Sequence, residues 1–127
     1  MKKYEFAKAI ENIATHLDGV CERIFVENVP SAFSTPIDDY LVLTTNGVKA
    51  TGLWQRTELQ GIILVRDKKT GVQDTKRLDE CINDLLSRFP YTDDYSSVIH
   101  PVVGTNGHEG EFSFVVISLS MTLKKTQ

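Results

Sequence analysis

Three glycines surround a histidine in GTNGHEG, residues 104–110, and this segment is the first candidate for chemistry. A glycine-rich segment can hold a phosphate when it follows a strand and opens a helix, because the helix N–H groups then point at the anion. Here the glycine spacing is GxxGxxG, and the segment leads into a strand pattern at 112–123. We therefore predict a hairpin connection and not a phosphate site.

The three histidines, His16, His100 and His108, are the next residues that could do chemistry. A catalytic or metal-bound histidine needs a carboxylate or a second ligand within reach. Glu109 adjoins His108, but the side chains of neighbouring residues in a turn usually point apart. We therefore expect no catalytic histidine.

Two pairs of acids, Asp38–Asp39 and Asp93–Asp94, complete the candidate chemistry. Paired carboxylates can bind a magnesium ion, but acids beside strands more often serve as capping or solubilising groups. We favour the second interpretation and predict no catalytic residue, no metal and no cofactor. The alternative is a small metal-dependent hydrolase that uses Asp38, Asp39 or His100.

Cys21 and Cys81 are too far apart for a CxxC redox motif, and there is no second pair of cysteines for a zinc site. Cys81 lies on the apolar stripe of a predicted helix, where a free thiol packs as a small hydrophobic group. We predict two structural thiols, with a disulfide between them as the alternative.

Length and composition predict a single soluble domain over residues 1–127. The chain is 41% hydrophobic and 24% charged, which is ordinary globular usage. Its net charge is −3, and its Lys and Arg pairs are scattered, so it lacks the basic face of a DNA-binding protein. Residues 1–17 carry charges throughout, and no apolar run reaches ~18 residues. We therefore expect no secretory signal, no membrane span and synthesis in a cytosol.

Two segments have helical periodicity. In the first, residues 2–17, the apolar positions are Phe6, Ile10, Ile13 and Leu17. In the second, the apolar stripe comprises Leu78, Cys81, Ile82, Leu85, Leu86 and Phe89. Asp74 or Thr75 can cap this second helix, which must end by Phe89 because Pro90 disfavours a helical residue before it.

Strand patterns occupy most of the remaining chain, at residues 20–29, 40–45, 48–67, 97–103 and 111–123. Asn46–Gly47 is a hairpin signal. The segment 46–60 could project as a β-arm, and residues 124–127 are expected to be frayed. The predicted fold class is α+β, in the order α-β-β-β-α-β-β, with a mostly antiparallel sheet and both helices packed on one face.

The segment 112–123 is apolar on both faces of its predicted strand. One face carries Val115, Ile117, Leu119, Met121 and Leu123. The other face begins with Phe112, Phe114 and Val116 before it becomes polar. Two helices on one face leave the other uncovered, and uncovered apolar surface marks an interaction site. We therefore predict a homo-oligomer with Phe112, Phe114 and Val116 in its interface.

Taken together, four pieces of this sequence resemble the lambda-type tail terminator proteins of long-tailed bacteriophages. KKYEFAKAIENIATHL is similar to the family's opening helix, and IFVENVPSAFSTPIDDYLVLTT to the strand, proline loop and strand that follow. LWQRTELQGIILVRDKKTGVQDTKRLDECINDLL resembles a strand that runs through a short turn into a second helix. GEFSFVVISLSMTL resembles the closing strand. The resemblance covers nearly the whole chain and is one of layout.

The resemblance implies a structural protein of the virion, made in the bacterial host cytoplasm, with no catalytic residue. Such subunits form a hexameric ring that caps the tail tube and joins it to the head. Their partners are the tail tube protein and a neck or head-completion protein, and DNA only passes through the lumen. A neck or head-closure connector and a host adaptor or binding module are the non-enzymatic alternatives. By position, the arm would contact neighbouring subunits through Val48, Leu53, Trp54, Arg56 and Glu58.

Overall fold

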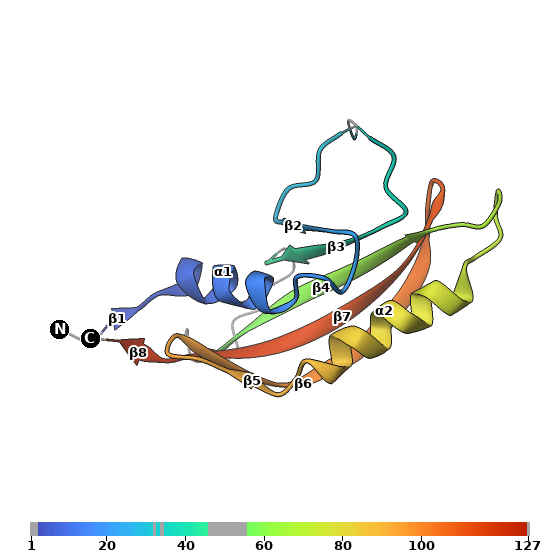
Figure 1. Ribbon diagram of the computed structural model, residues 1–127. Helices are drawn as coiled ribbons and strands as arrows, with labels where there is room; N and C mark the ends of the chain where they lie inside the picture. The colour runs from blue at the N-terminus through green and yellow to red at the C-terminus, as the bar shows by residue number, and fades with distance from the viewer. Residues whose placement is uncertain (1–2, 32, 34, 46–55, 127) are drawn as a thin grey trace.

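The computed structural model describes residues 3–31, 33, 35–45 and 56–126. Within these residues the chain forms two helices, a curled six-stranded sheet and a separate pair of short strands (Figure 1). In chain order the elements are β1 (Lys3–Tyr4), α1 (Phe6–His16), β2 (Arg23–Val26), β3 (Asp39–Thr44), β4 (Arg56–Arg66), α2 (Thr75–Ser87), β5 (Tyr91–Thr92), β6 (Ser96–Glu109), β7 (Phe112–Leu123) and β8 (Lys125–Thr126).

The large sheet is mixed, with the strand order β2-β3-β4-β7-β6-β5. β2 and β3 are parallel, and all other neighbours are antiparallel. A parallel neighbour needs a long connection that returns the chain to the same end of the sheet, and residues 27–38 supply it. The predicted α+β class with a mostly antiparallel sheet is therefore wrong. Strands make up 49% of the structure and helices 21%, and the sheet is curled as well as mixed.

Both helices form where the apolar periodicity predicts them. α1 buries Ile10 and Ile13 on one side, as their spacing requires. α2 begins after Asp74, whose side chain accepts a hydrogen bond from the backbone N–H of Arg77 at 3.1 Å. This contact confirms Asp74 as the N-cap. α2 ends at Ser87, before the proline that follows Phe89.

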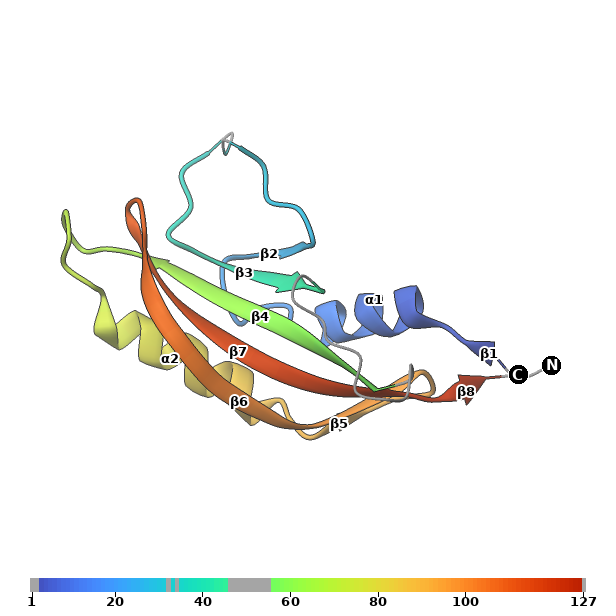
Figure 2. The same ribbon diagram turned by 180° about the vertical axis from the view of Figure 1, so that it is seen from behind.

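One face of the sheet packs against both helices. Figure 1 shows α2 in front of β7 and β6, and Figure 2 shows it behind them. Ile13 and Leu17 from the α1 segment and Leu85 from α2 belong to one continuous cluster with the sheet. The sheet side chains of this cluster alternate along each strand, as in Leu41 and Leu43. The main core of the molecule therefore lies on this helix-covered face.

The opposite face carries a smaller, aromatic cluster near one edge. Tyr40 is at its centre, with ring centroids of Phe25, Phe33 and Phe112 at 5.8, 5.4 and 5.2 Å. Phe33 comes from the connection 27–38, which forms an arch beyond the β2–β3 edge (Figure 1). Because Phe33 packs on the Tyr40 cluster, the arch covers part of the face that the helices leave open.

β6 and β7 form a hairpin that is longer than the sequence predicts. Residues 104–109 of GTNGHEG belong to β6, and only Gly110, at φ +60°, lies in the turn. The prediction that the whole segment is a connection is thus wrong. Register shifts between Val98 and Pro101 and between Val103 and Asn106 allow the strand to continue past the proline and glycines.

The two ends of the described chain lie side by side, because β1 pairs with β8. Lys125 and Thr126 are therefore ordered, whereas we expected residues 124–127 to be frayed. Of the predicted arm 46–60, residues 46–55 lie outside the described residues, and residues 56–60 pair with β7 as the start of β4. Among the described residues, no helix has the length and apolar character that a membrane span requires.

Candidate functional site

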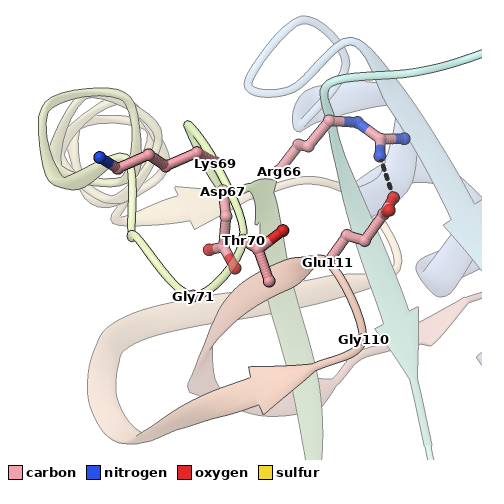
Figure 3. A pocket seen from close by; sticks show the side chains of 7 residues that line it. All are labelled: Arg66, Asp67, Lys69, Thr70, Gly71, Gly110 and Glu111. Carbon is pink, nitrogen blue, oxygen red and sulfur yellow. Dashed lines mark hydrogen bonds and ion pairs between the residues drawn. The ribbon is translucent and has the colours of Figure 1, made fainter.

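A polar cavity of about 260 Å³ opens where the end of β4 meets two turns. It lies between the turn that follows β4 and the turn of the β6–β7 hairpin (Figure 3). Its lining residues are Arg66, Asp67, Lys69, Thr70, Gly71, Gly110 and Glu111. With two basic and two acidic side chains, this lining carries no net preference for an anion or a cation.

Arg66, one of the two basic side chains in this lining, uses each of its three nitrogens in a hydrogen bond. Its Nη1 donates to Glu111 at 2.6 Å, and its Nε and Nη2 donate to the carbonyl oxygen of Ile37 at 3.2 and 3.0 Å. The guanidinium also lies over the ring of Phe112, 4.7 Å from its centroid. Arg66 therefore ties the arch to the hairpin turn, and its charge is already paired with Glu111.

Beside the cavity, Asp67, His108 and Ser113 form a cluster with the composition of a catalytic triad. The Ser113 hydroxyl lies 2.7 Å from Asp67 Oδ1 and 2.9 Å from His108 Nε2. An ionised carboxylate can only accept, so the hydroxyl donates to Asp67 and accepts from Nε2–H of His108. We expected no partner for His108, and this expectation is wrong.

The cluster is arranged for support and not for nucleophilic catalysis. In a triad the histidine stands between the serine and the acid and uses both ring nitrogens. Here Nε2 of His108 faces both partners, with Asp67 Oδ1 3.5 Å away. Ser113 is only 1% exposed, so no substrate carbonyl can reach its oxygen. The three side chains instead fasten the turn after β4 to the β6–β7 hairpin.

A second cluster joins Cys21, Asp39 and Cys81, whose donor atoms all lie within 4.8 Å of one another. Asp39 is held by Arg77, with Nε 2.8 Å and Nη2 3.2 Å from its two oxygens, and by the backbone N–H of Glu22 at 2.6 Å. It is the only group of three or more possible metal-ligating side chains among the described residues. Because Arg77 occupies both carboxylate oxygens, we assign this cluster to the ion pair and not to a metal.

The residues of the hydrolase alternative are not brought together. Asp38 and Asp39 lie at the start of β3, and His100 lies on β6, with β4 and β7 between these strands. Asp93 of the other acidic pair caps a turn, because its Oδ1 accepts from the backbone N–H groups of Tyr95 and Ser96. Asp39 and Asp93 therefore have structural roles.

His16 is also structural. Its Nε2 is 2.6 Å from the carbonyl oxygen of Arg88, and its ring stacks on Tyr91 at 4.1 Å. These contacts join the end of α1 to the segment that follows α2. Tyr91 and Tyr95 pack against the main core.

The predicted interface residues fall into three groups. Val48, Leu53 and Trp54 lie outside the described residues. Arg56 and Glu58 lie on β4 opposite Thr122 and Ser120 of β7. Phe112, Phe114 and Val116 are half-buried on the face opposite the helices. Phe112 is packed against Tyr40, and an added Cβ at Gly107 would lie 2.8 Å from the Phe114 ring.

The most exposed apolar side chains lie instead on β6, which the sequence analysis did not single out. Ile99, Val102 and Val103 are 54%, 58% and 45% exposed. On the side of β6 away from β7, β5 pairs only with residues 97–98. Among the described residues, no strand pairs with residues 99–109 on that side, so they form an outer edge of the sheet. The sequence predicts a strand at 97–103, which includes IHPVV, but it does not show that this strand lies at the edge of the sheet.

Val26 of β2 and Val103 of β6 lie at the same level on opposite edges of the sheet. Across the sheet, Val26 of β2 is level with Leu43, Gly61, Ile117 and finally Val103 of β6. Residues paired in this way share a face, so Val26 and Val103 both point to the helix-covered side. Val26 is 41% exposed. β2 and β6 run in opposite directions, as the alternation of the strands between them requires.

The chain was compared with known proteins. Neither protein-family models nor curated proteins give a match.

Proposed function

We propose that the protein is a virion assembly subunit of the tail terminator type, which forms a ring of identical copies by pairing β6 of one copy with β2 of the next. The observation that carries the proposal is the outer edge of β6, residues 99–109, with its exposed Ile99, Val102 and Val103. Exposed strand edges with apolar side chains are templates for pairing with another chain. The layout of the sequence, which resembles the tail terminator family, supports the same reading.

The match between β2 and β6 favours a ring over a two-fold dimer. A neighbour placed beside β6 at the same level would bring its Val26 against Val103, on the same face and with antiparallel strands. The two surfaces differ, so the contact is heterologous, and repeated heterologous contacts close into a ring when the rotation between copies permits. The family resemblance sets the expected number of copies at six.

A ring of this kind would cap the tail tube, stop its growth and offer its other side to a neck protein. The net charge of −3 suits a lumen through which DNA passes without binding. A neck or head-closure connector would use the same ring, and only the partner distinguishes the two stations.

Light scattering coupled to size-exclusion chromatography tests the ring. We expect a hexamer, or a monomer that becomes one as concentration rises, and rings by negative-stain imaging. Val103→Lys should leave a folded monomer, because a lysine on a strand edge blocks pairing. Asn83→Lys, an exposed site on α2, adds the same charge and should assemble normally.

Mixing two variants tests the heterologous contact. Val26→Lys blocks only β2, and Val103→Lys blocks only β6, so each should be a monomer alone. Together they retain one intact β6 and one intact β2, and we expect a one-to-one dimer that grows no further. Full rings in the mixture, or assembly of either variant alone, would refute the β6–β2 contact.

Tail tubes growing in vitro test the function itself. Added protein should bind one end of each tube and stop its elongation, seen as a fixed tube length by electron microscopy. Val103→Lys should leave tube growth unchanged. A ring that binds no tube would instead favour the neck or head-closure station.

A further inference from the structure

Cys21 and Cys81 are 60 positions apart in sequence (81 − 21), yet their sulfur atoms lie within 4.8 Å of each other. Cys21 lies in the segment between α1 and β2, and Cys81 lies on the sheet-facing side of α2. We propose that these two thiols are a redox-active pair that a peroxide converts into an intramolecular disulfide. This inference does not depend on the proposed function.

The surroundings of the pair make the two thiols unequal. Cys81 has a lowered pKa, because the neighbouring Cys21 thiol and the Arg77 guanidinium favour its thiolate; these effects outweigh burial, Asp39 and Glu80. Cys21 has a raised pKa, because of the Cys81 sulfur beside it and because of burial. Thiolates and not thiols are the nucleophiles, so Cys81 reacts first.

Arg77 is the positioning residue of the pair. Its guanidinium is fixed by the two hydrogen bonds to Asp39, at 2.8 and 3.2 Å, and its pKa is raised by this contact. Asp39 is 4% exposed and starts β3. The ion pair therefore holds a permanent positive charge beside the thiols, while the carboxylate balances it.

The oxidation balances with hydrogen peroxide as the only added reactant. The Cys81 thiolate attacks one peroxide oxygen, the O–O bond breaks, and Cys81 becomes a sulfenic acid while the other oxygen leaves as water after taking a proton. The Cys21 sulfur then attacks the Cys81 sulfur, the S–O bond breaks, and the hydroxide leaves as water with the Cys21 proton. Two thiols and one peroxide thus give one disulfide and two waters.

Burial restricts the oxidant by size. Cys21 is 7% exposed and Cys81 is 0% exposed. A peroxide is little larger than water, whereas aromatic disulfide reagents need the protein to open first. We therefore expect peroxide to react with the folded protein and the bulky reagent to react only after unfolding.

A bridge between these positions would join α2 to the segment that leads into β2. It would close a loop of 60 positions, and long loops restrict the unfolded chain strongly. The oxidised protein should therefore melt at least ~5 °C higher than the reduced protein.

The test treats the full chain with hydrogen peroxide in a chelator-containing buffer. We expect an intact mass about 2 Da lower, a tryptic link between Ala9–Arg23 and Leu78–Arg88, and a raised melting temperature that dithiothreitol reverses. Cys21→Ala and Cys81→Ala, each checked for folding by circular dichroism, should lose the link and the shift.

Three results would overturn the proposal. The first is an unchanged mass in folded protein under conditions that oxidise the unfolded chain. The second is oxygen added to either cysteine without a link. The third is a disulfide only between copies, which non-reducing electrophoresis would show as a dimer.

Discussion

The two faces of the sheet are built from the same strands but are closed in different ways. On one face, α1 and α2 cover a continuous aliphatic core that includes Leu119 and Ile117 at 0% exposure. On the other face, an arch of loop covers a small aromatic group around Tyr40, and the rest of β7 becomes polar at Ser118 and Ser120. A strand can thus be central to one core and nearly solvent-facing on its reverse side.

Because of this difference, we expect substitutions in the helix-covered core to change stability and substitutions on the exposed edge of β6 to change assembly. The side chains beneath the helices, such as Leu119, have no exposed surface to offer a partner, so their substitution should change the free energy of unfolding. Val102 and Val103 on β6 are 58% and 45% exposed and belong to neither cluster. Their substitution should change association and leave the monomer as stable as before.

The largest effect is expected for Leu119→Ala on the helix-covered face. Removing a fully buried leucine leaves a cavity, and we expect a loss of about 3 kcal/mol in the free energy of unfolding by urea titration. Ser120→Ala, the exposed neighbour on the reverse side, should change it by less than about 0.5 kcal/mol. Equal effects at the two positions would mean that the faces are not distinct.

Asp93→Asn tests how much the charge of the Asp93 carboxylate contributes to stability. Burial raises the pKa of Asp93, but hydrogen bonds from Tyr91 and from the backbone N–H groups of Tyr95 and Ser96 outweigh it, and the net pKa is lowered. The carboxylate therefore stabilises the fold above its unfolded pKa of about 3.9, and this stability is lost as the pH falls through the folded pKa.

We therefore expect Asp93→Asn to cost about 1.5 kcal/mol at pH 7, with the difference from wild type shrinking below about pH 3. Urea titrations at both pH values measure it. Asp94→Asn, at the exposed adjacent position, is the control and should have no effect at either pH. A difference that stays constant with pH would rule out the carboxylate charge as the cause.

The smallest change in the free energy of unfolding is expected for Gly107→Ala, on the face opposite the helices. The new methyl group would lie 2.8 Å from the Phe114 ring, which must move, and we expect a net loss of about 1 kcal/mol. In a Phe114→Ala background the overlap is gone, and only the reduced entropy of the unfolded chain remains. The same substitution should then be stabilising, and a double-mutant cycle would measure this reversal of sign.

The elements that depend on local signals could be predicted from the sequence. Both helices were predicted correctly, because the spacing of apolar residues and the N-cap hydrogen bond act within one helical turn, as between Asp74 and Arg77. The parallel pairing of β2 and β3 could not be, because a connection such as 27–38 allows either direction. Residues 104–109 of β6 were missed because glycines are rare inside strands, and a register shift is needed to accommodate them.

The candidate sites depended on contacts that no local pattern contains. Cys21 meets Cys81, and Asp67 meets Ser113, across 60 and 46 positions (81 − 21 and 113 − 67). Spacing rules for metals, redox motifs and triads describe residues that the backbone already brings close together. These pairs are brought together by the docking of α2 and by the sheet register, which the sequence alone does not set.

The position of β7 between β4 and β6 also determines when β4 can pair during translation. Leu59 of β4 pairs with Leu119 of β7, 60 positions later (119 − 59), so one edge of β4 has no partner until residues 112–123 have left the ribosome. Pairing over such a separation is slow as well as late. A ribosome that stalls within α2 would therefore present a nascent chain with an open apolar strand, the kind of species that chaperones must shield from aggregation.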